Sequence, residues 1–153
     1  MKNLKYILSL ILLTMSIHGY CQQMYDRSGS LIGRYDSGKI YDRSGSYEGK
    51  VDSGRFYNRS GSYIGYERDG KFYDRSGSYI GYTKDEKFYD RSGSYIGYIS
   101  GNNVYNRSGS LIGRVNRVPD LIVALVYFYG YFLGCSVRCS EKQMLKSPVK
   151  LLI

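Results

Sequence analysis

One pattern of apolar and polar positions repeats six times along the chain, without insertions, at a spacing of sixteen residues. The unit reads YDRSGSYIGY in its commonest form, and an apolar residue precedes each copy. A strict period indicates that each unit is one supersecondary element that packs mainly on its neighbours. The six units begin at Tyr25, Tyr41, Tyr57, Tyr73, Tyr89 and Tyr105.

Each unit is predicted to be a β-hairpin. In residues 72–82, Phe72 and Tyr73 end one strand, residues 74–77 form a turn, and residues 78–82 return as the second strand. An Asp or Asn at the first turn position can accept backbone hydrogen bonds, and a Gly at the fourth suits a type I turn with a bulge. A second turn, such as Asp36-Ser37-Gly38, joins each unit to the next. The expected fold class is all-β, a pseudo-symmetric, ring-like meander of tandem 16-residue hairpins.

The apolar positions of the unit are predicted to form the core. A glycine in the returning strand of every unit costs strand propensity, which favours close approach of another backbone or an aromatic ring at a crowded centre. Glu48 takes the isoleucine position in the second unit and marks an edge, a ligand-facing site or a degenerate copy. The expected core residues are Met24, Ile40, Phe56, Phe72, Phe88 and Val104, with Ile32, Ile64, Ile80, Ile96 and Ile112; the glycines are Gly33, Gly49, Gly65, Gly81, Gly97 and Gly113.

The N-terminal residues 1–21 are predicted to be a secretory signal peptide. Lys2 and Lys5 precede an apolar run, and small residues at Gly19 and Cys21 suit cleavage before Gln22. A lipoprotein acylated at Cys21 is the alternative. The chain is therefore expected to be secreted or held in the cell envelope.

An apolar, aromatic segment, 119–137, follows the repeat domain, which is expected over 22–118. Residues 121–137 carry no charge and reach the lower limit for a membrane span, with a basic tail at 138–153. The same composition suits closing strands or a buried plug, which is the favoured interpretation. Cys135 and Cys139 are four residues apart, a spacing that favours unpaired thiols.

The search for chemistry argues against an enzyme. Cleavage of the signal peptide would remove His18, the only histidine, and with it Ser-His-Asp, Cys-His and histidine metal sites. The repeated carboxylate becomes Asn58 and Asn106 in two units, which a turn cap tolerates and a general acid does not. No cofactor or metal is expected. Residues 25–116 hold fifteen Lys or Arg against eleven Asp or Glu, a mild bias spread along the chain.

Arginine is the residue that turn chemistry leaves unexplained. Its turn position accepts most residues, yet all six units carry it. A structural role would stack each guanidinium on a tyrosine or bridge it to a carboxylate of the next unit. A functional role would make a ring of arginines, with flanking tyrosines, that binds anionic groups or sugars. The candidate site residues are Arg27, Arg43, Arg59, Arg75, Arg91 and Arg107, with Tyr25, Tyr41, Tyr57, Tyr73, Tyr89 and Tyr105.

The units YDRSGSLIGR, YDRSGSYIGY and YNRSGSLIGR, with their D-x-G-like links and the aromatic tail after VNRVP, resemble the bacterial 4-fold β-flower proteins. A more distant likeness is to the YD repeats of large secreted proteins. The resemblance covers about residues 24–133 and implies hairpins arranged as petals about an axis. It implies no biochemical activity. Six copies depart from the fourfold name, so either the hairpins are counted differently or this member is enlarged.

Two functions follow. The first is a binding module for anionic polymers or glycans of the cell envelope; nucleic acid is disfavoured by the export signal. The second is a structural, surface-display scaffold tethered to the membrane by residues 121–137, which predicts that a chain ending at Pro119 is soluble and folded.

Overall fold

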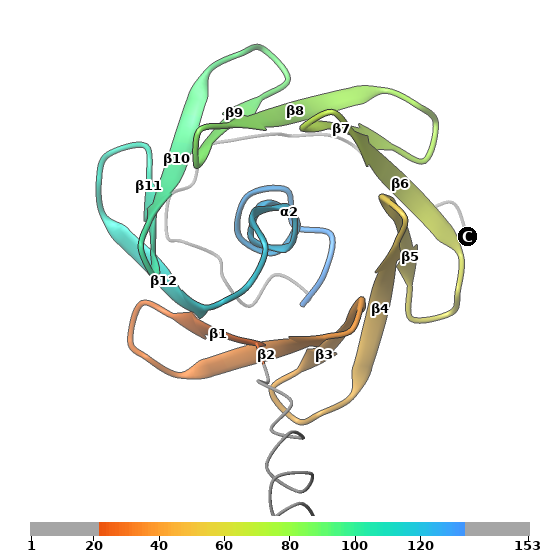
Figure 1. Cartoon of the computed structure of the whole chain (residues 1–153), viewed down its shortest axis with the longest axis horizontal. Coiled ribbons are helices and arrows are strands. Elements are labelled where there is room, and N and C mark those ends of the chain that lie inside the picture. Colours follow the sequence, from red (N-terminus) through yellow and green to blue (C-terminus); the bar gives the residue numbers. More distant parts are fainter. Residues whose placement is uncertain (1–21, 134–153) are drawn as a thin grey trace, which may run out of the picture.

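Six β-hairpins form a closed ring in the computed structural model, which describes residues 22–133 (Figure 1). Each hairpin spreads outward from the ring like a petal, and petals 1 to 6 are numbered here in chain order. The predicted all-β fold of tandem hairpins is confirmed. The strands are β1 (Gln22–Asp26) and β2 (Leu31–Asp36), β3 (Lys39–Asp42) and β4 (Tyr47–Asp52), β5 (Arg55–Asn58) and β6 (Tyr63–Arg68), β7 (Lys71–Asp74) and β8 (Tyr79–Lys84), β9 (Lys87–Asp90) and β10 (Tyr95–Ser100), β11 (Asn103–Asn106) and β12 (Leu111–Asn116).

Every strand pairs antiparallel with the strands before and after it, and β1 pairs with β12 to close the ring. In that closing pair, Met24 lies opposite Val115 and Tyr25 opposite Arg114. No strand of the ring is left with an open edge, because the first and last strands satisfy each other's backbone groups.

The loop at the end of each petal, called the petal tip, has the predicted turn chemistry. In petal 1 the amide of Gly29 donates to the Asp26 carbonyl at 3.1 Å, and the amide of Asp26 donates to the Ser30 carbonyl at 2.9 Å. Gly29 has φ of 86°, the left-handed conformation that completes a type I turn with a bulge. The same two bonds recur at the other five petal tips.

The second turn, between petals, is tighter. Ser37 and Gly38 both have positive φ, 48° and 86°, as a two-residue hairpin turn whose twist matches its strands requires. Glu86 takes the glycine position of this turn in one unit and adopts φ of 60°, a conformation unusual for its residue type. At Asp85 and Glu86 the residues of this turn therefore change while its two positive φ angles are kept.

The predicted core is correct for one set of positions and wrong for most of the other. The residue before each unit's tyrosine faces inward and is at most 1% exposed in all six units, from Met24 to Val104. The isoleucines are only half-buried, with the exception of Ile112 at 7%. The cause is a β-bulge: Phe72 lies opposite Gly81 and Tyr73 opposite Tyr79, so Ile80 is the extra residue. The corrected residues are Ile32, Ile64, Ile80 and Ile96.

The segment after the repeats fills the centre of the ring. A short helix, α2 (Asp120–Val123), continues into a π-helical turn, η1 (Ala124–Phe128), and α2 lies at the middle of the ring in Figure 1. Its residues Ile122, Val123, Ala124 and Leu125 are fully buried. Residues 120–133 are called the plug below. Up to residue 133 the segment is helical and largely buried and contains no strand, as the favoured plug interpretation expects, whereas residues 134–137 lie outside the described residues.

Within residues 22–133, no helix has both the length and the apolar character needed to cross a membrane. The predicted signal peptide, Cys21, Cys135, Cys139 and the basic tail lie outside the described residues.

Five of the six strand glycines make room for the plug, each for one of its side chains. A Cβ at Gly81 would lie 2.6 Å from the Tyr129 hydroxyl, and one at Gly33 would lie 2.7 Å from the Leu133 side chain. Gly65 differs, because a Cβ there would face the side chain of Phe56 from a neighbouring strand and not a plug residue. Phe56 in turn contacts the aromatic ring of Tyr131 edge-on. The expectation of a crowded, ring-like centre is confirmed. The contacts are Gly113 with Tyr127, Gly97 with Phe128, Gly81 with Tyr129, Gly49 with Phe132 and Gly33 with Leu133.

Two plug tyrosines also hydrogen-bond to the ring. The Tyr127 hydroxyl donates to the Tyr25 carbonyl at 2.7 Å, and the Tyr129 hydroxyl donates to the Tyr89 carbonyl at 2.9 Å. Burial raises the pKa of both phenols above the usual range. The plug is thus held by directed bonds as well as by packing, and its phenols stay neutral at physiological pH.

Candidate functional site

Five of the six candidate arginines project into solvent from the petal tips. Among residues 22–133, their side chains make no hydrogen bond, ion pair or ring contact. Stacking on tyrosine and direct bonds between units are therefore not seen at these positions, although Arg107 of petal 6 interacts electrostatically with Asp90 of petal 5. The five are Arg27, Arg43, Arg75, Arg91 and Arg107.

Arg59 is the exception and does bridge two petals. Its Nε donates to the carbonyl oxygen of Tyr47 at 2.9 Å, and its Nη2 pairs with the carboxylate of Glu48. Both partners belong to petal 2, whereas Arg59 stands at the tip of petal 3. The structural interpretation holds for this arginine, and it depends on the one unit that carries Glu in place of Ile.

The repeated Asp and Asn side chains shape the petal tips. Oδ1 of Asp74 accepts from the amides of Ser76 at 2.8 Å and Ser78 at 2.9 Å, and from the Ser76 hydroxyl at 2.6 Å. Asn58 accepts the equivalent three bonds through its amide oxygen. Because a neutral amide does the same work, the position acts as a turn cap and not as a general acid or base.

These bonds predict an acid-sensitive fold. The Ser76 hydroxyl lowers the pKa of Asp74 below its ordinary 3.8, and the matching serine does the same for Asp26 and Asp42. For Asp90, where desolvation opposes the shift, serine hydrogen bonds still lower the pKa. A carboxylate with a lowered pKa stabilises the fold above its unfolded pKa, and this contribution is lost as pH falls through the folded pKa. We expect the free energy of unfolding to decrease below about pH 4.

The measurement is urea unfolding followed by tyrosine fluorescence at pH 7 and pH 3. The matched variant replaces all four aspartates by Asn, the residue already present at positions 58 and 106. This variant is expected to lose less stability between the two pH values than the natural chain. An equal loss in both proteins would contradict the role assigned to these carboxylates.

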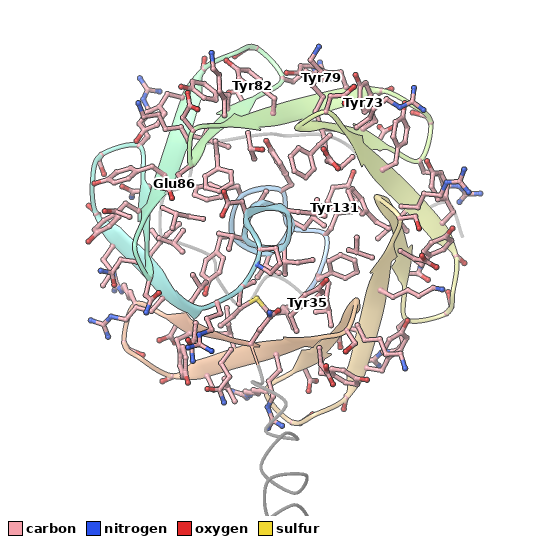
Figure 2. The ribbon with its side chains drawn as sticks, viewed as in Figure 1. Tyr35, Tyr73, Tyr79, Tyr82, Glu86 and Tyr131 are labelled. Atoms are coloured by element: carbon pink, nitrogen blue, oxygen red, sulfur yellow. The ribbon has the colours of Figure 1, made fainter. Side chains whose placement is uncertain are left out.

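The candidate tyrosines lie half-buried on the outer face of the ring, each at the centre of a cross-strand row. Tyr73 stacks on Tyr66 with ring centroids 4.7 Å apart and meets Tyr79 edge-on at 5.8 Å. Figure 2 shows Tyr73, Tyr79 and Tyr82 outside the ring, whereas Tyr35 and Tyr131 point inward. Stacking of this kind occurs in the three rows that contain Tyr66, Tyr82 and Tyr98, where one face of the candidate tyrosine is covered by its neighbour.

The composition of these rows changes around the ring, which the sequence analysis missed. The residue that follows the strand glycine is Tyr66, Tyr82 and Tyr98 in three rows but Arg34, Lys50 and Arg114 in the others. Lys50 places its ammonium 5.1 Å from the centroid of Tyr57. The sixteen-residue alignment already contains this change, so comparing flanking positions unit by unit would have found it.

Grooves between neighbouring petals bring tip residues against the half-buried bulge residue of the petal before. One groove, of about 470 Å³, is lined by Ile64 of petal 3 and by Asp74, Arg75 and Ser76 of petal 4. Another, of about 550 Å³, lies between petals 2 and 3, with Glu48 opposite Asn58, Arg59 and Ser60. The bulge that removes isoleucine from the core thus places it beside the next arginine.

Residues 22–133 contain no group of three or more His, Cys, Asp or Glu placed to hold a metal ion. The expected absence of cofactors stays a prediction.

Comparison with known proteins gives one match, to a family model described as the 5-fold beta-flower protein, over residues 21–132. The comparisons with curated proteins and with solved structures gave no match. The predicted family is confirmed apart from its petal number, since the expectation was a 4-fold flower and this ring has six hairpins. Beta-flower proteins are not a known class of enzyme. Because the match covers more than two thirds of the sequence, the chain belongs to the beta-flower family of repeat proteins.

Proposed function

We propose that this chain is an exported, non-enzymatic binding module that uses its petal-tip arginines to hold an anionic glycan or polymer of the cell envelope. The observation that carries the proposal is the exposure of five arginines whose side chains make no hydrogen bond, ion pair or ring contact within residues 22–133, although Arg107 interacts electrostatically with Asp90 of petal 5. A guanidinium presents five N–H donors in a fork that matches carboxylate, sulfate and phosphate groups. An arginine that makes no hydrogen bond, ion pair or ring contact in five of six units is better explained by a ligand than by the fold.

The ring supports this function through repetition. Each isolated arginine contact at an exposed site contributes little, about 0.2–1 kcal/mol. A polymer that reaches several petal tips makes later contacts within the same complex, so the overall affinity exceeds that of any single contact. The outer tyrosines contribute hydroxyl donors and acceptors along the petals, in keeping with a sugar-rich ligand.

The proposal predicts salt-sensitive retention on heparin that depends on the petal tips. Arg75→Ala combined with Arg91→Ala is expected to weaken heparin binding about two- to thirtyfold, since two contacts of about 0.2–1 kcal/mol each are lost, and to lower the salt concentration needed for elution. The measurement is elution salt on a heparin column, together with titration calorimetry against a heparin fragment. Lipopolysaccharide is the second test polymer.

The matched control is Lys71→Ala with Lys87→Ala, which removes the same charge from exposed positions at the other end of the hairpins. Equal effects of both pairs would reduce the binding to net charge alone. Unchanged retention of the arginine variant would overturn the proposal and leave a surface-display scaffold as the function. A membrane tether at 121–137 has little to support it, because residues 121–133 are packed inside the ring.

A further inference from the structure

The groove between petals 2 and 3 breaks the symmetry of the ring. It is the groove whose bulge residue is Glu48 instead of an aliphatic residue, and its arginine is the one held in place. Residues of the plug also line it, whereas the groove between petals 3 and 4 is lined by ring residues alone. A pseudo-symmetric protein with one chemically distinct groove has the means to bind one ligand group there and not elsewhere.

Arg59 and Glu48 together form a fixed donor and acceptor pair. The two bonds that Arg59 makes to petal 2 leave three of its five N–H donors unused. Its side chain is 63% exposed and that of Glu48 is 22% exposed, so both remain accessible. Because Glu48 neutralises Arg59, the pair offers hydrogen bonds without a net charge, which favours a neutral ligand over an anion.

The floor of this groove is aromatic and aliphatic. Gly130, Tyr131, Phe132 and Leu133 line it from the plug side, opposite the polar residues of the petal 3 tip. Tyr131 is held in place by an edge-on contact with Phe56, with ring centroids 6.0 Å apart. The volume of about 550 Å³ lies in the range of ordinary small-ligand sites.

A pyranose ring matches this combination. One edge of the sugar carries neighbouring hydroxyls, each both donor and acceptor, and its C–H face is apolar. The geometry points to a monosaccharide-binding site in which Arg59 donates to one hydroxyl, Glu48 accepts from its neighbour, and the C–H face rests on Gly130 and the half-buried Tyr131. The site would bind a single neutral pyranose unit of a glycan, and this inference rests on the proposed glycan-binding function.

The test is NMR titration of the isotopically labelled protein with methyl α-D-mannopyranoside and methyl β-D-glucopyranoside, in the tens of millimolar. At least one is expected to shift the Arg59 Nε–H resonance and the backbone amides of residues 130–133. Glu48→Ile should weaken that binding at least tenfold. Isoleucine occupies this position in all five other petals and is buried in one of them, as Ile112. The variant is therefore expected to fold, which its own NMR spectrum will show.

Arg75→Ala is the matched control, because Arg75 lies outside this groove. It should leave pyranoside binding unchanged, whereas Arg75→Ala combined with Arg91→Ala weakens heparin retention. Glu48→Ile should weaken pyranoside binding without weakening heparin retention, because it leaves Arg59 without its carboxylate partner. The two proposals therefore fail separately. Absence of shifts at Arg59 with both sugars, or equal binding by Glu48→Ile, would overturn the monosaccharide site whatever the heparin result.

Discussion

A chain that ends at Pro119 is expected to lose the folded ring. The truncation removes the plug, including the buried side chains of Ile122, Leu125 and Phe132, each of which stabilises the fold by about 1.5–3 kcal/mol on burial. It also exposes the inward-facing residues of all six hairpins to water. The summed loss is comparable with the total stability of an ordinary domain, about 5–15 kcal/mol. This expectation reverses the sequence-based hypothesis that such a chain is soluble and folded.

Circular dichroism and amide chemical-shift dispersion measure the outcome. The control is a chain that ends at Gly134, which keeps the whole plug and is expected to stay folded. A synthetic peptide of residues 119–133, added to the truncated chain, should restore dispersed resonances if the plug acts through packing alone. A cooperative unfolding transition in the chain ending at Pro119 would show that the ring does not need its plug.

Filling a strand glycine is expected to be the most damaging single substitution. At Gly81 an added Cβ would collide with the Tyr89 carbonyl oxygen on the neighbouring strand and with the Tyr129 side chain in the plug. Overpacking of this kind costs about 1–3 kcal/mol and occasionally more, because the surrounding backbone must move. Gly81→Ala should therefore lower the free energy of unfolding by at least that amount, as measured by urea unfolding.

The controls separate the collision from the loss of glycine as such. Gly93→Asn, at a petal tip with no atom within 4 Å of the added carbon, should cost under about 1 kcal/mol, because Asn tolerates the left-handed conformation. Tyr129→Ala combined with Gly81→Ala should cost less than the sum of the two single variants. Recovery stays partial, since the Tyr89 carbonyl remains. A Gly81→Ala protein as stable as the natural chain would refute the close fit.

The local features of the fold were predictable from the sequence because short-range chemistry decides them. A turn with Asp74 as its cap and Gly77 in the left-handed conformation is specified by residues within five positions of one another. The buried position before each unit's tyrosine follows from the same repeat, as does the need for close contact at the strand glycines. The exposed place of the arginine at the tip follows from the turn, although its freedom from partners does not.

Other features depend on which residues meet across the ring, and these only the tertiary structure decided. The bulge at Ile80 shifts the strand register and moves this side chain out of the core. No residue type within the unit predicts the position of that bulge. The composition of residues 121–133 suits strands, a plug or a membrane span and only favours the plug until the ring around them is known. Arg59 and Glu48 are eleven residues apart and belong to different petals, so their pairing follows from petal geometry.

The sequence by itself determined the hairpin, its turns, the number of repeats and the residues that neither turn nor core requires. The tertiary structure decided how six hairpins close on a helical plug, which arginines stay free, and where the symmetry breaks. The physical reason is the distance along the chain between the residues that interact. Turn chemistry acts between neighbours in the chain, whereas the plug meets Gly33 and Gly113 from opposite ends of the repeat array, contacts that exist only once the ring has closed.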